Sequence, residues 1–540
     1  MKDISSTGSF INFYLNNYIY VDKTQYIRDL IKLERVFISR PRRFGKSLTL
    51  DTIATLFETG VEPYFKGTWI YDKWTEPTYP VLRLNFLDLD KYSLEHFKQK
   101  LNAIISSFAR DINVKNYEEK VEPEDTIYFL LDELRKEKRQ IVILIDEYDC
   151  QMTANINNES LYKQFQEKIK SFYATIKNKW PIKFLGITGV TRLKDVEIFS
   201  IGSDIRDITN ASAYSQMIGF TRDEIKKYYI DYLTLAASYE NNCSVDKVTD
   251  AQIESMLDMM AQNYDGYCFD EFYKKKVFST WSVNSFFQSI IENKFVDFGD
   301  YWYDNGGLPS ILVNYLKTHK LNIFDYLYKK KRLKVTDDDF KNPTALTSMN
   351  QNVLMCQTGY LTLRSSLNDS NIIALGIPNG EIYKALNKLL AAKFFKGKID
   401  VTNDVNENIL DVGSVEDIIS LLNTMVNTVT YDAYPLNSES AVQNYVKAYL
   451  LGAKQTVSSE VHQAKGRADL MIETNKRRIV FEFKYAQNET EAKIKLNEAV
   501  EQIKTRDYGN ILPKKAELLR IAAVFNADPK VRAFTLSQQV

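Results

Sequence analysis

The sequence predicts an α/β protein whose first third contains a parallel sheet covered by helices on both faces. Two patterns support this fold class. Short runs rich in β-branched residues alternate with longer segments whose apolar residues recur at helical spacing. The short runs are apolar along nearly their whole length, as strands buried on both faces of a sheet are. We predict strands at residues 35–39, 79–86, 140–149 and 182–190, and helices at residues 126–139 and 159–178.

The composition is that of a globular chain with more than one domain. Of its 540 residues, 44% are hydrophobic and 26% are charged, close to the usual values for soluble proteins. No apolar run is long enough to span a membrane, no signal-peptide pattern is present, and the four cysteines lack C-x-x-C spacing. We therefore expect a cytoplasmic protein without a disulfide framework or a zinc site. Because 70 basic residues balance 70 acidic ones, any contact with nucleic acid must come from a local groove.

The string R-P-R-R-F-G-K-S at residues 40–47 is similar to a phosphate-binding loop. In the usual pattern, G-x-x-x-x-G-K-[ST], backbone N–H groups approach the phosphates, the lysine reaches the β- and γ-phosphates, and the hydroxyl binds Mg²⁺. Gly45, Lys46 and Ser47 supply the second half of this pattern, between a predicted strand and a predicted helix whose N-terminus favours anions. Arg40 stands where the first glycine is expected.

A second motif, I-L-I-D-E-Y-D, follows about 100 residues further on. It places Asp146 at the end of an apolar strand, where a carboxylate can hold Mg²⁺, and Glu147 beside it, where a carboxylate can orient an attacking water. The alternative is a buried strand that ends in a solvated acidic turn. After the next predicted strand comes Arg192, which either stabilises transition-state charge at this site or is an ordinary residue at a strand end.

A third group of charged residues lies near the C-terminus. Glu482 and Lys484 share one face of a predicted strand. If T-N-K-R forms a hairpin loop, Glu473 pairs with Arg478, and continuing the count places Asp469 opposite Glu482, about 5 Å away on the same face. Two such carboxylates repel each other unless they share a cation, and Mg²⁺ suits both the ligands and phosphodiester hydrolysis. Lys484 would then orient the attacking water or stabilise charge on the scissile phosphate. The alternative is an amphipathic hairpin with a solvated charged face.

Six strings along the chain together resemble one family. They are Y-V-D-K-T-Q-Y-I-R-D-L-I, S-R-P-R-R-F-G-K-S, L-I-D-E-Y-D, G-I-T-G-V-T-R-L, I-G-F-T-R-D-E-I and Y-D-G-Y-C-F. The family is that of predicted AAA-ATPase-like proteins of bacteria and mobile elements, whose members usually end in a nuclease domain of the PD-(D/E)XK superfamily. In that family an R-P-R-R loop replaces the first Walker glycine, so Arg40 is a family trait, and we expect glycine to be tolerated in its place. The resemblance also implies that Arg42 and Arg43 hold phosphates.

The resemblance to the PD-(D/E)XK core implies two further site residues. An upstream helix contributes another acid in that core, and Glu439 occupies its place, whereas Gln502 occupies the polar position of the following helix. The alternatives are that Glu439 is an acid that stabilises a helix N-terminus and that Gln502 is a solvated side chain.

These observations predict an α/β chain of five regions. The first is a P-loop NTPase parallel sheet, followed by a helical lid, a small α+β module that could be a winged helix, a helical connector and an α/β PD-(D/E)XK-like nuclease domain. Their predicted bounds are 1–221, 222–305, 306–395, 396–430 and 431–540, with a strand pair at 359–366 and 371–378 in the module. The predicted function is that of an ATP-regulated, Mg²⁺-dependent nuclease whose partner is nucleic acid, above all DNA, with oligomerisation left open. The alternative is a nucleotide-dependent binding switch that uses an inactive nuclease fold as a recognition module.

Overall fold

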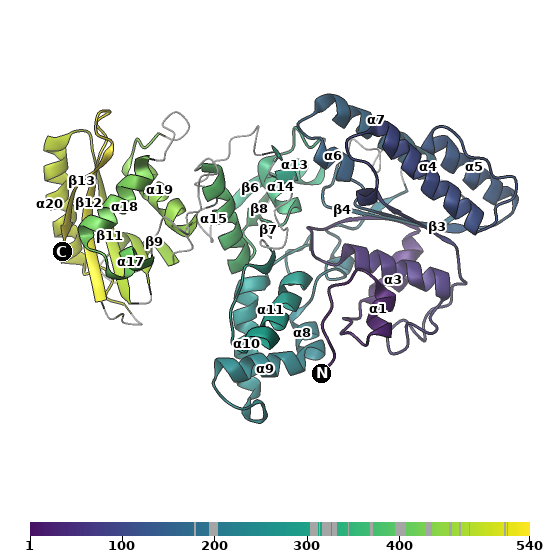
Figure 1. Ribbon diagram of the computed structural model, residues 1–540, viewed down its shortest axis with the longest axis horizontal. Coiled ribbons are helices and arrows are strands. Elements are labelled where there is room, and N and C mark those ends of the chain that lie inside the picture. The colour runs from purple at the N-terminus through teal and green to yellow at the C-terminus, as the bar shows by residue number, and fades with distance from the viewer. Residues whose placement is uncertain are drawn as a thin grey trace. The chain divides into compact units, whose positions relative to one another are not determined.

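The chain folds into two compact units, which are described separately here. Unit 1 comprises Met1–Leu321 and Lys330–Ile382, and unit 2 comprises Asn322–Lys329 and Tyr383–Val540 (Figure 1). The computed structural model describes residues 1–177, 180–193, 204–302, 311–312, 314–315, 326, 332–343, 345–367, 371–394, 407–427, 435–452, 456–463, 466–474, 476–511, 515 and 517–540. The predicted bounds of the five regions stay predictions, and the connector residues 396–406 and 428–430 lie outside the described residues.

Unit 1 contains the predicted parallel sheet. Its strand order is β2-β3-β4-β1-β5, and every neighbouring pair is parallel. The four predicted strands are present, and only the two-residue strand β5 was missed. Every residue of β1 and β3 is buried, as the unbroken apolar runs predicted. The strands are β1 Arg35–Ser39, β2 Val81–Asn85, β3 Ile141–Asp146, β4 Ile182–Gly189 and β5 Arg206–Asp207.

Helices cover both faces of this sheet. Figure 1 shows α3 on one face and α4, α5 and α7 on the other. The predicted helices following the phosphate-binding string and at residues 126–139 and 159–178 correspond to α3, α5 and α7. The helices are α1 Phe10–Leu15, α2 Thr24–Leu30, α3 Lys46–Thr59, α4 Leu94–Asp111, α5 Pro123–Lys136, α6 Cys150–Ala154 and α7 Glu159–Ile176.

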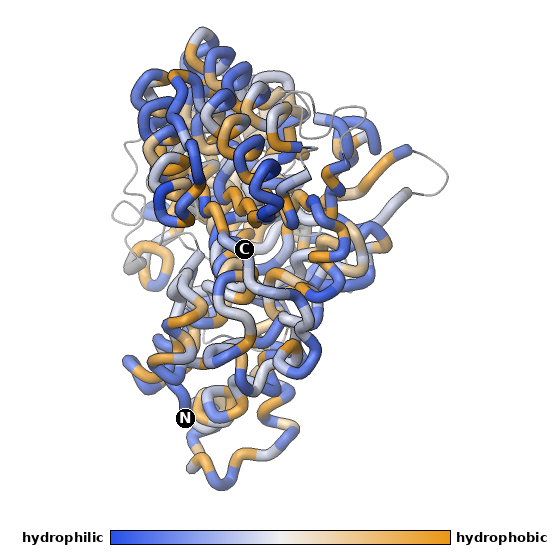
Figure 2. The backbone as a smooth tube through the Cα atoms, turned by 90° about the vertical axis from the view of Figure 1, so that its right-hand side faces the viewer, coloured by the Kyte–Doolittle hydropathy of each residue, from blue (hydrophilic) through white to orange (hydrophobic). Residues whose placement is uncertain are grey.

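The predicted helical lid is a group of four helices with its own apolar core. Its Tyr and Phe side chains pack into this core, as with Tyr229 against Phe287 at 5.2 Å between ring centroids. Capping boxes at Thr221 and Thr249 fix the starts of two of these helices. Figure 2 shows hydrophobic and hydrophilic positions alternating along the helices, as expected for helices with one buried face. The four are α8 Arg222–Tyr228, α9 Ile230–Glu240, α10 Asp250–Tyr264 and α11 Thr280–Asn293.

The last part of unit 1 is a small three-stranded antiparallel sheet of order β6-β8-β7. The predicted strand pair at 359–366 and 371–378 is confirmed as β7 and β8, and β6 adds a third strand. The elements are β6 Leu333–Thr336, α13 Asp337–Lys341, α14 Gln351–Gln357, β7 Thr362–Leu367 and β8 Ile372–Gly376.

Helix α15, Gly380–Phe394, contains the boundary between the two units, which falls after Ile382. In its first turn lies Glu381, whose side chain is fully within the interior at 1% exposure. The Glu381 carboxylate accepts hydrogen bonds from the backbone N–H of Trp302 and the hydroxyl of Ser282, both at 2.8 Å. A buried carboxylate therefore fixes the start of the helix within unit 1.

Unit 2 consists of a five-stranded mixed sheet and helices. The order is β13-β12-β11-β10-β9, with β11 and β12 parallel and the other pairs antiparallel. Helix α20 forms the crossover that a parallel pair requires, and its apolar side packs on Met471 and Val480. The elements are α17 Glu407–Val412, α18 Val415–Asn427, α19 Glu439–Gly452, β9 Thr456–Gln463, β10 Gly466–Glu473, β11 Arg477–Ala486, α20 Glu489–Arg506, β12 Glu517–Asn526 and β13 Ala533–Gln539.

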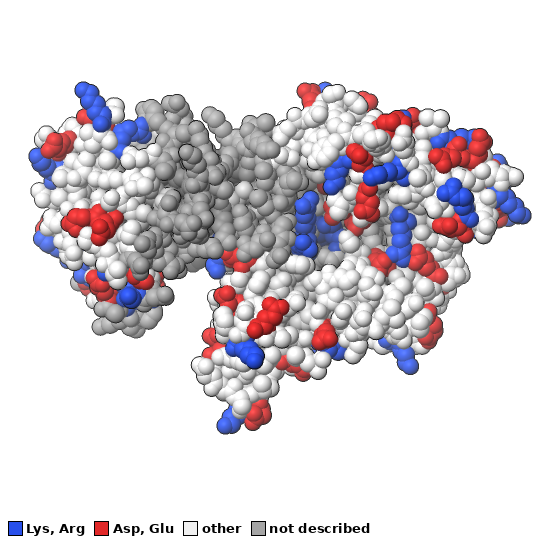
Figure 3. Space-filling model, viewed as in Figure 1, with Lys and Arg blue, Asp and Glu red and all other residues white. Residues whose placement is uncertain are grey.

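The surface of unit 1 carries both signs of charge. Figure 3 shows Lys and Arg side chains interspersed with Asp and Glu over the visible face, in keeping with the zero net charge of the sequence. Among the described residues, no helix combines the length and the apolar character needed to cross a bilayer.

Candidate functional site

The phosphate-binding string forms the turn from β1 into α3. Gly45 adopts a φ of +100°, the left-handed region that suits glycine, and Arg43 adopts a φ of +68°. No neighbouring atom lies within 4 Å of where a Cβ of Gly45 would be, so backbone conformation rather than space requires glycine there. Lys46 and Ser47 follow as the first residues of α3, at the helix end where backbone N–H groups and the helix dipole favour anions.

Lys46 points back into this loop. Its side chain is 4% exposed, and its ammonium donates to the backbone carbonyls of Arg40 at 3.2 Å and Pro41 at 3.3 Å. The same ammonium lies 3.5 Å from the carboxylate of Glu147. The carboxylate of Glu147 therefore lies next to the ammonium of Lys46, so both groups could contact the same ligand.

Ser47 and Asp146, 99 residues apart in the sequence, are in direct contact. The Ser47 hydroxyl donates to Asp146 Oδ2 at 2.6 Å, and Asp146 Oδ1 accepts from the Thr188 hydroxyl and from the backbone N–H of Glu147. A serine hydroxyl and a carboxylate are hard oxygen ligands of the kind that Mg²⁺ prefers. The donor set thus fits the cation that the two motifs predict.

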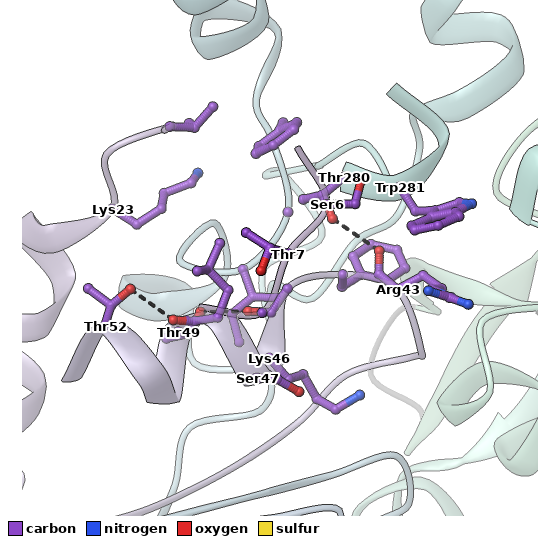
Figure 4. Close-up of a pocket in the computed structure, with 18 of the residues that line it drawn as sticks. Ser6, Thr7, Lys23, Arg43, Lys46, Ser47, Thr49, Thr52, Thr280 and Trp281 are labelled. Carbon is purple, nitrogen blue, oxygen red and sulfur yellow. Dashed lines mark hydrogen bonds between the residues drawn. The ribbon is translucent and has the colours of Figure 1, made fainter. Parts of the chain in front are cut away.

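Lys46, Ser47 and Glu147 border a cavity of about 480 Å³ in unit 1, a volume within the usual range of small-molecule sites. Figure 4 shows Lys46 and Ser47 on one side of it, with side chains from the N-terminal segment and α11 around the rest. Much of the remaining lining is apolar. It includes Ile19, Tyr20, Val21, Ile27, Met217, Ile218, Phe220 and Tyr229.

The sequence motifs did not assign these apolar residues to a site. Five of them lie in the strings Y-V-D-K-T-Q-Y-I and I-G-F-T, which were part of the family resemblance but lack groups with obvious chemistry, and Ile19 and Met217 directly precede these strings. Lys23 donates to Glu224 at 2.6 Å and to the carbonyl of Gln216 at 2.8 Å, which ties the two segments together. The place of both strings in the family resemblance is a sequence signal that could have indicated this part of the cavity.

Arg42 and Arg43 both line the cavity. The guanidinium of Arg43 lies 4.1 Å from the ring centre of Trp281, a cation–π contact. The Arg43 carbonyl accepts from the Thr280 hydroxyl at 3.0 Å, and the Arg42 carbonyl accepts from the Trp302 indole at 3.3 Å. The start of α11 and Trp302 therefore hold the loop on the side away from Lys46.

Arg40 is buried and bonded within the domain, which argues against the expectation that glycine would replace it freely. It is 1% exposed, donates to the carbonyls of Ser39 and Thr209, and lies 4.1 Å from the ring centre of Phe269. Burial lowers the pKa of Arg40 to about 9, although the charge of Asp207 opposes this shift. The reason for the difference is tertiary: the carbonyl of Thr209 and the ring of Phe269 are far away in sequence.

Arg192 does not line the cavity that contains Lys46. Its guanidinium pairs with Asp207, and its backbone N–H donates to the side chain of Gln357 at 3.1 Å. It borders a separate, much smaller cavity of about 30 Å³ together with Arg40. A role at the phosphates would require this ion pair to open.

The second aspartate of D-E-Y-D organises the same strand end, a role that the sequence did not indicate. The buried Asp149 accepts from the backbone N–H of Thr191 at 2.7 Å and from its hydroxyl, while Tyr148 donates to the Thr191 carbonyl at 3.0 Å. Burial, and then the charge of Glu147, raise the pKa of Asp149 above its usual value. Asp149 therefore fixes the loop that contains Arg192.

In unit 2, the hairpin of β10 and β11 has the predicted register. Glu473 pairs with Arg478, and the ladder runs to Leu470 opposite Phe481. Asp469 and Glu482 follow this last pair on the two strands, but they are not themselves paired in the ladder, so their opposition stays a prediction. Asp469 Oδ2 accepts from the backbone N–H of Phe483 at 2.8 Å, and its charge acts on Glu482.

This charged face is not solvated, which argues against the amphipathic-hairpin alternative. The side chain of Glu482 is 1% exposed, and its Oε1 accepts from Lys484 Nζ at 2.9 Å. Its other oxygen, Oε2, is buried and has no hydrogen-bond partner among the described residues. A buried carboxylate oxygen without a partner is costly unless a ligand completes it, and Mg²⁺ fits this place.

The pKa values follow from this burial. Burial, followed by the charge of Asp469, raises the pKa of Glu482 to about 7. Burial raises the pKa of Asp469 to about 6, against the opposing effect of the Phe483 N–H. Burial alone would lower the pKa of Lys484, but the charges of Glu482 and Glu439 outweigh it, so the pKa is raised and the ammonium stays protonated.

The two remaining predicted residues lie at different distances from this cluster. Glu439, in the first turn of α19, has its carboxylate 3.7 Å from Lys484 Nζ. Gln502, on α20, donates to the Tyr508 hydroxyl at 3.4 Å, and Arg506 donates to the same hydroxyl at 3.0 Å. Within the part of the chain that the structure describes, no group of three His, Cys, Asp or Glu side chains could hold a metal, so the carboxylate pair would bind a cation with help from substrate or water.

The comparisons with known proteins match one family in the N-terminal part of the chain and another in the C-terminal part. Residues 5–199 match the model of a family described as predicted AAA-ATPase, and residues 437–534 match that of the PD-(D/E)XK nuclease superfamily. An uncharacterized protein in the vnfD 5′ region of Azotobacter chroococcum mcd 1 is 24% identical over 532 residues, or 95% of this chain and 94% of the relative.

Two solved structures are also similar to parts of the chain. Cdc6p from Pyrobaculum aerophilum is 12% identical, covers 68% of this chain and 93% of its own, and has a TM-score of 0.22. The Aeropyrum pernix ORC1 protein in complex with DNA is 10% identical, covers 71% of this chain and 98% of its own, and has a TM-score of 0.26.

Proposed function

We propose, starting from an AAA-ATPase-like domain at residues 5–199 and a PD-(D/E)XK superfamily domain at residues 437–534, that the chain is an ATP-regulated, Mg²⁺-dependent nuclease that cleaves DNA. The observation that supports it most is the cluster of Asp469, Glu482 and Lys484. It combines two interacting carboxylates, one with a buried oxygen that has no partner among the described residues, and an ammonium bonded to that same carboxylate. Mg²⁺ together with a phosphodiester would satisfy all three groups at once.

In this proposal Asp469 and Glu482 hold Mg²⁺, which when bound would stabilise negative charge on the reacting phosphate and activate water. Lys484 donates a hydrogen bond to a phosphate oxygen, because its pKa is raised and it remains charged. The Phe483 N–H holds Asp469 in one orientation. Glu439 keeps Lys484 between two carboxylates, and Gln502 orients Tyr508 at the edge of the site.

At the other site, Lys46 exchanges its bonds to the loop carbonyls for bonds to ATP phosphates, and Arg42 and Arg43 add positive charge on the same side. Ser47 and Asp146 hold Mg²⁺, and Glu147 orients the attacking water. Arg192 contributes to the transition state only after its pairing with Asp207 has opened. The apolar side of the cavity receives the base.

One observation favours a second candidate function. No described group of three ligating side chains surrounds the carboxylate pair, which would suit a recognition module that no longer cleaves. In that case the chain is a nucleotide-dependent binding switch whose PD-(D/E)XK domain holds nucleic acid without hydrolysing it.

Cleavage assays separate the two functions. The full chain is incubated with supercoiled plasmid and with labelled single- and double-stranded DNA and RNA, in Mg²⁺ or EDTA, with and without ATP. We expect Mg²⁺-dependent cleavage of DNA that changes with ATP and is lost in Glu482→Gln, while Glu489→Gln, an exposed acid on α20, cleaves normally. If the unmodified chain binds these substrates but cleaves none under any condition, the binding switch is the better description.

A further inference from the structure

We infer that the N-terminal residues Ser5–Gly8 form a strap that completes the nucleotide cavity and contacts the bound nucleotide directly. This inference rests on the proposed nucleotide site. All four residues line the same cavity as Lys46 and Ser47. Ser5 and Thr7 are half-buried, whereas Ser6 and Gly8 are exposed, so the strap separates part of the cavity from solvent. Figure 4 shows Ser6 and Thr7 beside the side chains of the loop and of α11.

The strap is fastened at both ends. Before it, the Lys2 carbonyl accepts from the Tyr232 hydroxyl and the Asp3 carbonyl accepts from the backbone N–H of Ile19, both at 2.9 Å. After it, the backbone N–H of Phe10 donates to Asp51 on α3 at 2.6 Å. Because residues before Ser5 are bonded to Tyr232 and Ile19, and Phe10 after Gly8 is bonded to α3, the strap has a defined path across the cavity.

Asn284 on α11 holds the middle of the strap. Its side-chain amide donates to the Ser5 carbonyl at 3.2 Å and the Ser6 hydroxyl at 3.3 Å, and its Oδ1 accepts from the Tyr229 hydroxyl at 2.6 Å. Asn284 is 6% exposed, and Tyr229 fixes which end of the amide faces the strap. Asn284 is therefore a positioning residue for Ser5 and Ser6.

The strap offers the hydroxyl chemistry that an oxygen-rich ligand needs. Ser5 Oγ accepts from the backbone N–H of Thr7, Thr7 Oγ1 accepts from the backbone N–H of Ser9, and Ser6 Oγ accepts from Asn284. Each hydroxyl also has one proton to donate. Because protein donors occupy their acceptor sides, these hydroxyls are set to donate toward ribose or phosphate oxygens.

The position of Gly8 places the strap at the phosphate end. A Cβ on Gly8 would lie 3.9 Å from Ser47 Cβ, so the strap passes directly over the residue that contacts Asp146. A nucleotide bound at the loop would therefore lie beside the strap, within reach of its hydroxyls. Nucleotide affinity should depend on residues Ser5–Gly8.

The test measures binding of a fluorescent ATP analogue with Mg²⁺ to the full chain, well below its melting temperature. Asn284→Ala, and separately a deletion of residues 2–7, should each weaken binding about tenfold, the effect of losing one or two hydrogen bonds to the strap or its ligand. Asn293→Ala, at the exposed end of the same helix, is the control and should bind normally. The deletion variant decides the matter if Asn284→Ala does not fold.

Hydrogen exchange gives a readout that a purely structural role would not change. Mg-ATP should slow exchange of the amides of residues 3–9 in the unmodified chain but not in Lys46→Ala. Nucleotide affinities within about twofold of the unmodified chain for both strap variants, with no protection of residues 3–9, would overturn the inference while leaving the proposed function intact. If the unmodified chain does not bind the analogue at all, the nucleotide site itself fails and the strap fails with it.

Discussion

The two candidate sites use similar groups but differ in how their carboxylates are satisfied by the protein. Asp146 in unit 1 accepts hydrogen bonds from Ser47, Thr188 and the backbone of Glu147. Glu482 in unit 2 has one oxygen bonded to Lys484 and one buried without a partner among the described residues. The carboxylate of the first site is bonded on both oxygens within the protein, whereas the second leaves one oxygen without a partner among the described residues, which the proposed cation would supply. We therefore expect ligand removal to cost stability mainly in unit 2.

The largest expected effect comes from the carboxylate pair. Asp469→Asn or Glu482→Gln should reduce DNA cleavage by about 10³-fold or more, because a metal contributes several kcal/mol to such a transition state. In EDTA each variant should melt at the same or a higher temperature than the unmodified chain, since the repulsion between two carboxylates is relieved. The measurement combines cleavage rates with melting curves in EDTA and in Mg²⁺.

Glu489→Gln is the matched control and should change neither quantity. If Glu482→Gln instead melts well below the unmodified chain in EDTA, Glu482 stabilises the fold by itself. The contrast between the two sites would then be wrong.

The next effect concerns the phosphate-binding loop. Lys46→Ala should weaken binding of Mg-ATP by about 10- to 100-fold, because charge-assisted hydrogen bonds contribute about 1.5–3 kcal/mol. Glu147→Gln should bind nearly as well but hydrolyse ATP more slowly. Calorimetric titration and a phosphate-release assay measure the two steps, with Lys32→Ala, an exposed lysine, as the control. If Lys46→Ala bound Mg-ATP with unchanged affinity, the hypothesis that the unit 1 cavity binds nucleotide would be wrong.

Substitution of Arg40 tests whether contacts within the protein stabilise the phosphate-binding loop of unit 1 without a ligand. Arg40→Gly should lower the free energy of unfolding by about 2 kcal/mol, since it removes two bonds to carbonyls and the contact with Phe269. Arg28→Gly, whose side chain is 42% exposed, is a surface comparison. Denaturant unfolding gives the difference. A variant as stable as the unmodified chain would show that desolvation of the guanidinium cancels its contacts.

The smallest expected effect is a pH dependence of stability in EDTA. Folding raises the pKa of Asp469 to about 6 and of Glu482 to about 7 from usual values of 3.8 and 4.5. The folded state therefore binds more protons than the unfolded state between about pH 4 and pH 7, so stability is highest below this window and falls as pH rises through it. We expect the free energy of unfolding in EDTA to be lower at pH 8 than at pH 5.

Urea unfolding at the two pH values measures this loss. Mg²⁺ should reduce it, because the cation takes the place of the protons, and Glu482→Gln should show a smaller loss than the unmodified chain. A rise in stability with pH in EDTA would mean that the carboxylates gain a partner on folding.

Much of the chemistry of unit 2 was predictable because it depends on local pairing. Alternation along β11 put Glu482 and Lys484 on one face, and a short loop fixed the register with β10, which is confirmed from Glu473 opposite Arg478 to Leu470 opposite Phe481. The strands of unit 1 were predictable for a similar reason, since buried parallel strands are unbroken apolar runs. What local pairing could not reveal is that the face of Glu482 is covered rather than solvated.

The rest of unit 1 could not be predicted because it depends on contacts between distant segments. Arg40 is buried by Thr209 and Phe269, and the cavity wall combines residues near position 20 with residues near position 218. Arg192 looked available to phosphates, but Asp207, on a strand of only two residues, pairs with it. No periodicity in the sequence marks such a strand.

The boundary between the units lies inside helix α15, and this has a practical consequence for taking the chain apart. A fragment that stopped at Ile382 would end within the first turn of a helix whose Glu381 is bonded to Ser282 and Trp302. The complementary fragment would begin at Tyr383 and would expose Ala385 and Leu386, which are buried in the full chain, at a frayed helix end. Fragments that overlap over the whole of Gly380–Phe394 avoid both defects at this helix.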